Sequence, residues 1–186
     1  MGRGRAAAAL LALALLAVAA PAAAQGVLTQ EEALRLAFPA GTQVERRTAY
    51  LDEAQLAAAR RAAGPGVELT QRVVTHYVGT RGGRPVGVAY FDSHRVRTLP
   101  EVLMIVVDVH ARVERIEVLK FGEPPEYRAP EKWLERVEGK ALAPELALKR
   151  GVPHLSGATL TAEAVTAAAR RVLALHAVVR PLEVRR

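Results

Sequence analysis

Residues 102–107, Val-Leu-Met-Ile-Val-Val, place apolar side chains on both faces of any strand that they form. Such a strand belongs inside a sheet that helices cover, because an exposed face would leave apolar surface in water. Four runs are rich in β-branched and aromatic residues. A short turn joins the run at 72–80 to the run at 85–92, and a second short turn joins 102–109 to 113–121. Runs paired in this way predict two β-hairpins, and therefore an antiparallel sheet of about four strands.

Helices are expected before the sheet. Two capping-box patterns, each of which opens a helix, are formed by Thr29 with Glu32 and by Asp52 with Gln55. The first helix should end before Pro39 and the second at residue 63, with a short strand between them at 43–50.

Two further helices are expected after the sheet. Residues 130–138 place Trp133, Leu134 and Val137 on one face of a short amphipathic helix, and a loop at 140–155 follows. An alanine-rich helix then begins near Thr161 and runs to about residue 176. Strand hairpins flanked by helices in this order predict an α+β fold.

The N-terminus has the pattern of an export signal. A basic start, an apolar run of 15 residues at 6–20 and three alanines before Gln25 predict a signal peptide at residues 1–24. Retention of this run as a membrane anchor is the alternative, although it is short for a spanning helix. The expected divisions are this signal, a helical N-terminal extension, a main domain and a tail, at residues 1–24, 25–70, 71–177 and 178–186.

The composition narrows the possible functions. The chain has no cysteine, which excludes disulfides, c-type haem attachment and cysteine-ligated iron–sulfur clusters. The formal net charge is +7, but the basic residues are scattered and aromatic residues are few, so we expect no nucleic-acid partner. The five histidines show no metal-ligand spacing, and we expect no metal site.

Ser156-Gly157-Ala158-Thr159 is the segment richest in chemistry. Two hydroxyls and a glycine lie just before a helix, where free amides and the helix dipole favour an anion. The pattern suits a phosphate group, and Thr161 adds another hydroxyl. The alternative is that Thr159 or Thr161 is only a helix cap and Gly157 only a turn residue.

These four residues resemble the flavinylation motif of the FMN-binding domain family, found in periplasmic subunits of sodium-pumping quinone reductases and Rnf-type electron-transport complexes. The order of the other landmarks over residues 71–175 is similar too, namely the strands, the Glu123-Pro124-Pro125-Glu126-Tyr127 segment, Trp133 and Gly139-Lys140. The resemblance implies FMN as cofactor, joined through its phosphate to Thr159 by a flavin transferase outside the cytoplasm. Pro153 departs from the family pattern, which usually has aspartate three residues before the serine.

The candidate cofactor-binding residues are Thr159, Ser156, Gly157, Ala158, Leu155, Thr161, Trp133, Lys140 and Tyr127. Trp133 suits stacking on the flavin ring, and alternatively a place in the core. Lys140 suits a phosphate, and alternatively the carbonyl groups at the end of the preceding helix. No catalytic residue stands out.

The sequence therefore predicts an exported FMN protein that transfers electrons to a membrane or periplasmic redox partner. Its expected location is the periplasm or the outer face of the inner membrane. One alternative is a periplasmic interaction or assembly module of the same fold without covalent flavin, and another is a flavin-dependent reductase of a small substrate.

Overall fold

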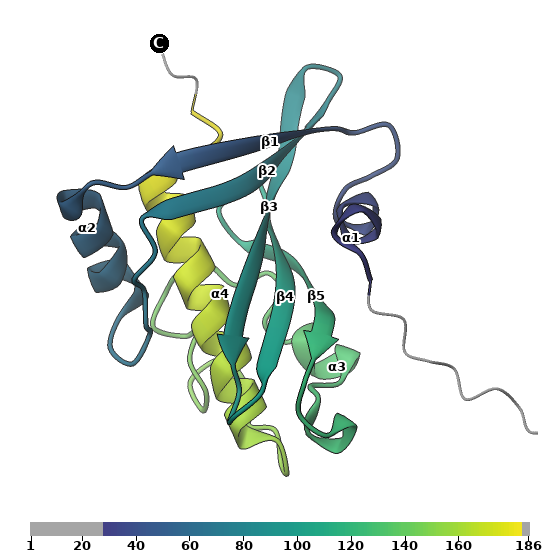
Figure 1. Cartoon of the computed structure of the whole chain (residues 1–186), viewed down its shortest axis with the longest axis vertical. Coiled ribbons are helices and arrows are strands. Elements are labelled where there is room, and N and C mark those ends of the chain that lie inside the picture. Colours follow the sequence, from purple (N-terminus) through teal and green to yellow (C-terminus); the bar gives the residue numbers. More distant parts are fainter. Residues whose placement is uncertain (1–27, 184–186) are drawn as a thin grey trace, which may run out of the picture.

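The computed structural model describes residues 28–183, so the expected signal peptide lies outside the described residues. The elements in chain order are α1 (Gln30–Ala37), β1 (Gln43–Tyr50), α2 (Glu53–Ala63), β2 (Val73–Arg81), β3 (Arg84–Arg95), β4 (Pro100–Val107), β5 (Val113–Phe121), the 3₁₀ helix η1 (Pro125–Tyr127), α3 (Glu131–Leu134) and α4 (Thr159–Val179). Figure 1 shows the twisted sheet between α1 on one side and α2 with α4 on the other. The α+β class is confirmed.

The sheet has five antiparallel strands in the order β1-β2-β3-β4-β5, one more than the four expected. The additional strand is β1, which pairs with β2 from Gln43 opposite Thr80 to Tyr50 opposite Val73. The segment expected to be a helical extension thus contributes an edge strand as well as α1 and α2. Local patterning predicted the strand, but its partner lies about thirty residues away in sequence.

Strand β4 lies in the interior, as its apolar pattern predicted. Leu103, Ile105 and Val107 face the core beneath α2 and α4, whereas Met104 and Val106 face the smaller core beneath α1. All five side chains are fully buried. The alternation of a strand thus divides one apolar run between two cores.

Helix boundaries follow local signals closely at the N-terminal end. Both capping boxes are formed, at Thr29 for α1 and at Asp52 for α2. The C-terminal expectations need correction: α3 is one turn long instead of spanning 130–138, and α4 begins at Thr159 and ends at Val179. Trp133, Leu134 and Val137 are nevertheless buried together, because the turns after α3 keep the chain against the core.

The sheet forks between β2 and β3. The two strands are paired only from Tyr77 opposite Ala89 to the turn, where Arg81 lies opposite Arg84. Beyond Tyr77, β2 stays with β1, while residues 90–95 of β3 stay with β4. The diverging strands are visible in Figure 1. The edge of β3 on the side of β2 is therefore unpaired over these residues.

Candidate functional site

The motif forms a tight turn that leads directly into α4. Ala158 N donates to Leu155 O at 3.2 Å, and Gly157 between them has a φ of 80°. Glycine adopts this angle without the strain that a side chain would bring. A Cβ at Gly157 would meet no atom within 4 Å, so the space in front of the turn is open to a ligand.

The first turn of α4 has no side-chain cap. The N-cap residue is Ala158, and the first helical hydrogen bond runs from Ala162 N to Ala158 O at 3.0 Å. The amides of Thr159, Leu160 and Thr161 precede this bond and have no acceptor within the helix. No acidic side chain lies in the first turn. The interpretation of either threonine as a helix cap is therefore wrong, and the positive end of the helix dipole is left for an anion.

The three hydroxyl groups near the turn differ in what they contact. Thr161 is buried and its Oγ1 donates to Tyr127 O at 2.6 Å, so this hydroxyl joins α4 to η1. Thr159 Oγ1 lies 3.4 Å from Nε2 of the exposed His154. Ser156 is exposed on the turn. Thr159 and Ser156 are thus the hydroxyls that a ligand can reach.

Trp133 supports the motif from within the core. Its side chain is 6% exposed, and its indole Nε1 donates to the carbonyl oxygen of Pro153 at 3.0 Å. The indole therefore holds the backbone at Pro153, just before the turn. Trp133 thus occupies a core position, which was the alternative to stacking in the sequence analysis. Any stacking of Trp133 on a flavin ring stays a prediction.

The backbone contacts of Lys140 lie away from the turn. Its carbonyl oxygen accepts from Val113 N at 2.9 Å, at the first residue of β5. Tyr127, in contrast, is the last residue of η1, and its carbonyl oxygen accepts from the Thr161 hydroxyl of α4. Hydrogen bonds thus hold Tyr127 and Trp133 to residues that flank the motif, and a phosphate contact of Lys140 stays a prediction.

Exposed apolar side chains surround this end of the molecule. Leu99 is 44% exposed, Tyr127 44% and Leu160 49%. Their segments are linked, because Glu123 Oε1 accepts from the amides of Thr98 and Leu99 at 2.7 and 2.8 Å. These backbone hydrogen bonds hold the pKa of Glu123 below its usual value. A partner or a planar ligand would find apolar contacts beside the motif.

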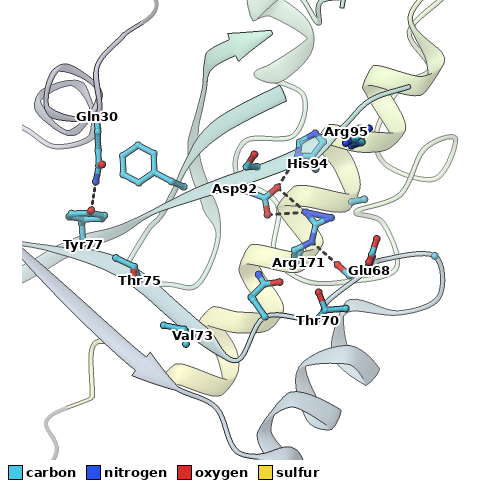
Figure 2. Close-up of a pocket in the computed structure, with 16 residues that line it drawn as sticks. Gln30, Glu68, Thr70, Val73, Thr75, Tyr77, Asp92, His94, Arg95 and Arg171 are labelled. Atoms are coloured by element: carbon cyan, nitrogen blue, oxygen red, sulfur yellow. Dashed lines mark hydrogen bonds and ion pairs between the residues drawn. The ribbon is translucent and has the colours of Figure 1, made fainter. Parts of the chain in front are cut away.

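A second polar cluster lies on the α4 side of the sheet and was not predicted from the sequence. His94 lies between two carboxyl groups, with Nδ1 2.8 Å from Asp92 Oδ1 and Nε2 3.0 Å from Glu101 Oε2. Arg171 of α4 donates from Nη1 to both oxygens of Asp92 at 2.8 and 2.9 Å, and from Nε to Glu68 O at 2.7 Å. Figure 2 shows Arg171 reaching from α4 to β3. The cluster thus ties α4 to the end of the β3–β4 hairpin.

The cluster shifts the protonation of its members. Burial opposes a charge on His94, but the hydrogen bonds and negative charges of Asp92 and Glu101 raise its pKa to about 9. Burial likewise opposes the charge on Asp92, yet His94 and Arg171 lower its pKa below the usual value. His94 is therefore a cation at neutral pH.

This shift predicts a loss of stability in mild alkali. His94 has a higher pKa in the folded protein, about 9, than the ordinary value of 6.5, so its contribution is present below pH 6.5 and is lost as the pH rises through 9. We expect the free energy of unfolding to fall by up to about 3 kcal/mol across that range. Urea unfolding at a series of pH values measures it. The His94→Gln variant should lack this decline, and parallel curves for both proteins would contradict the assignment.

A groove of about 910 Å³ opens where β2 and β3 diverge. Figure 2 shows side chains of both strands on its walls and Arg171 at its base. Its α4 surface consists of Ala164, Ala167 and Arg171. The groove therefore lies against the helix that begins at the motif.

Comparison with protein families gives one match. Residues 100–174, from the first residue of β4 into α4, match the family described as FMN-binding domain. This match agrees with the resemblance drawn from the motif, and the similarity of residues 100–174 to an FMN-binding domain supports FMN as the cofactor. Comparisons with curated proteins and with solved structures found no match. The matched segment contains the motif, Glu101 and Arg171, whereas Asp92 and His94 precede it.

Proposed function

We propose that this protein is an exported FMN-dependent electron carrier that holds the flavin phosphate at the first turn of α4. The observation that carries the proposal is the uncapped N-terminus of α4 directly after the Ser156–Thr159 turn, in a segment that matches the FMN-binding domain. Its three free amides and reachable hydroxyls suit a phosphate group. FMN supplies the electron-transfer chemistry, and the protein holds and orients it.

We further propose that Thr159 Oγ1 is the attachment atom. A flavin transferase would move the FMN phosphoryl group from a flavin dinucleotide: the Oγ1–P bond forms, the diphosphate bond breaks, the nucleoside monophosphate leaves and the hydroxyl proton is lost. His154 Nε2, 3.4 Å from Oγ1, is the nearest basic group to that proton. The open space around Gly157 supports access by the transferase.

Electron transfer to a membrane or periplasmic partner is proposed because the apolar side chains of Leu99, Tyr127 and Leu160 are exposed on segments linked to the motif. A partner that docks there would come close to a flavin held at Thr159. Export and a location in the periplasm or on the outer face of the inner membrane rest on the signal pattern at residues 1–24. Among residues 28–183, every helix is too short or too polar to cross a bilayer.

Pro153 favours an alternative in which the protein carries no covalently attached flavin. Pro153 occupies the position where the resembling family usually has aspartate, and its carbonyl group is bound to Trp133. If the transferase requires that carboxyl group, the protein would be an interaction or assembly module without covalent flavin.

Co-expression with a flavin transferase in a host that exports the chain tests the proposal. The denatured protein should gain the mass of one FMN less one water, and the native protein should show a flavin absorption spectrum that reduction bleaches reversibly. Native flavin without the mass increment would support the non-covalent alternative. A protein that neither carries flavin nor takes up added FMN would refute the electron-carrier function.

A further inference from the structure

We propose that the free edge of β1 is a dimer interface, at which β1 pairs antiparallel with β1 of a second copy of this chain. The two edge strands of the sheet are β1 and β5 (Figure 1). The edge of β5 is covered, because Val113 N donates to Lys140 O at 2.9 Å and Ile116 N to Glu138 Oε1 at 3.4 Å. In β1, by contrast, seven of the eight residues are exposed. An open strand edge of this length is a template for a further strand.

The free backbone groups of β1 belong to alternate residues. Leu51 N donates to Arg72 O at 2.7 Å and therefore points towards β2. Because successive residues of a strand direct their backbone groups to opposite edges, the groups that point away from β2 are those of residues 44, 46, 48 and 50. A two-fold axis at Arg47 would place residue 44 opposite residue 50, and residue 46 opposite residue 48. In this register every outward N–H and carbonyl group of β1 would be hydrogen-bonded.

The same register joins exposed apolar side chains. Ala49 faces the core beneath α2 and α4, so Val44 and Tyr50 lie on the opposite face of the strand. They are 41% and 77% exposed, and Val73, which lies opposite Tyr50 on β2, is exposed as well. Each Val44 would pack against Tyr50 of the second copy, and the two-fold axis repeats this pair. Dimerisation would thus cover apolar surface that the monomer leaves in water.

The charges of β1 favour this register over the neighbouring one. Arg47 would lie beside Arg47 of the second copy, but in each copy its Nη2 donates to Glu45 Oε2 at 2.6 Å and its Nη1 to Pro181 O at 3.2 Å. Each guanidinium group is thus paired within its own chain. An axis at Arg46 would instead place two Arg46 side chains directly opposite each other and would separate Val44 from Tyr50 of the second copy.

The interface lies at the far end of α4 from the motif. Thr159 and Val179 are the first and last residues of α4, and about 30 Å of helix separates them. The segment after Val179 contacts β1 through Pro181 O and Arg47. A dimer paired through β1 would therefore leave the motif of each copy accessible, so the proposal does not depend on the flavin chemistry.

Sedimentation velocity of the exported protein, from micromolar to millimolar concentration, tests the interface. We expect a monomer–dimer equilibrium whose dissociation constant rises by about tenfold in Val44→Lys, because this one change removes two apolar pairs and places a lysine on each edge. Val109→Lys makes the same change at an exposed position in the turn between β4 and β5 and should leave the equilibrium unchanged. Circular dichroism establishes that each variant is folded.

Cross-linking tests the register. The chain has no cysteine, so a single introduced thiol reports on one position. In Arg47→Cys the two thiols would lie directly opposite each other in a pair without hydrogen bonds, which is close enough for a disulfide. In Arg46→Cys each thiol would lie opposite Thr48 of the second copy. Under the same mild oxidation we expect Arg47→Cys to form a covalent dimer and Arg46→Cys to stay largely monomeric.

Two results would overturn the proposal. One is a monomer at every concentration, which would leave the edge of β1 to a strand of another protein. The other is a dimer whose dissociation constant is the same in Val44→Lys as in wild-type protein, with Arg47→Cys cross-linking no faster than Arg46→Cys. A dimer that is weakened by Val44→Lys but not by Val109→Lys, and that is cross-linked through Arg47→Cys, would support it.

Discussion

Thr159→Ala should abolish covalent flavin completely, because the variant lacks the one atom to which the phosphate is proposed to be joined. The fold should be unaffected, since Thr159 Oγ1 has only a long contact of 3.4 Å with the exposed His154. Intact mass of the denatured protein, after co-expression with a flavin transferase, measures the increment. Stability should change by no more than about 1 kcal/mol, because a single partly exposed hydrogen bond is lost.

Two matched variants separate attachment from mere disturbance of the turn. Thr159→Ser keeps a hydroxyl at the first residue of α4 and should still be labelled, and Ser156→Ala removes the other reachable hydroxyl but should keep the increment. A full increment in Thr159→Ala would place the bond on a different residue. Loss of the increment in Ser156→Ala together with retention in Thr159→Ala would assign the bond to Ser156.

Arg171→Met should be the most destabilising of the substitutions considered. Arg171 binds both oxygens of the buried Asp92 and also holds Glu68 O, so its loss leaves a buried carboxylate beside His94 alone. Breaking a buried ion pair from one side costs about 3–5 kcal/mol. We expect a loss of this size in the free energy of unfolding, measured with urea at pH 7.

The exposed pair of Arg35 with Glu31 provides the control, since Arg35→Met should cost less than about 1 kcal/mol. Adding Asp92→Asn to Arg171→Met should recover part of the stability by removing the unpaired charge. If Arg171→Met costs no more than Arg35→Met, Arg171 does not tie α4 to β3 in the way described.

Local sequence patterns predicted most of the secondary structure. Both capping boxes, the short strand at 43–50 and the hairpin turn between the runs at 72–80 and 85–92 depend on neighbouring residues, and each is formed as expected. The interior position of β4 was equally predictable, because a strand with apolar side chains on both faces is stable only between two covering layers.

Contacts between distant residues were not predictable in the same way. Asp92 and Arg171 are 79 residues apart, and the charged side chains that meet in this cluster resemble ordinary surface residues in the sequence. The one local signal was the i, i+2 spacing of Asp92 and His94, which places both on one face of β3. The fork that opens the groove was hidden as well, since it arises from β2 following β1 while β3 follows β4.

The sequence predicted the chemical groups of the candidate site, but it did not predict the hydrogen-bond partner of each group. The motif identified the turn and the helix that follows it. The structure then showed that the Thr161 hydroxyl is bound to Tyr127 and that the Trp133 indole is bound to Pro153. Such assignments depend on which backbone carbonyl lies within reach, and a single sequence does not reveal that.

The most direct test of a phosphate site at the start of α4 is an NMR comparison of the backbone amides in apo and FMN-loaded protein. We predict that the amide resonances of Thr159, Leu160 and Thr161 shift most, together with that of Gly157, because the phosphate would bind their free N–H groups. Unchanged resonances at these four amides in protein that has bound FMN would contradict the proposed site.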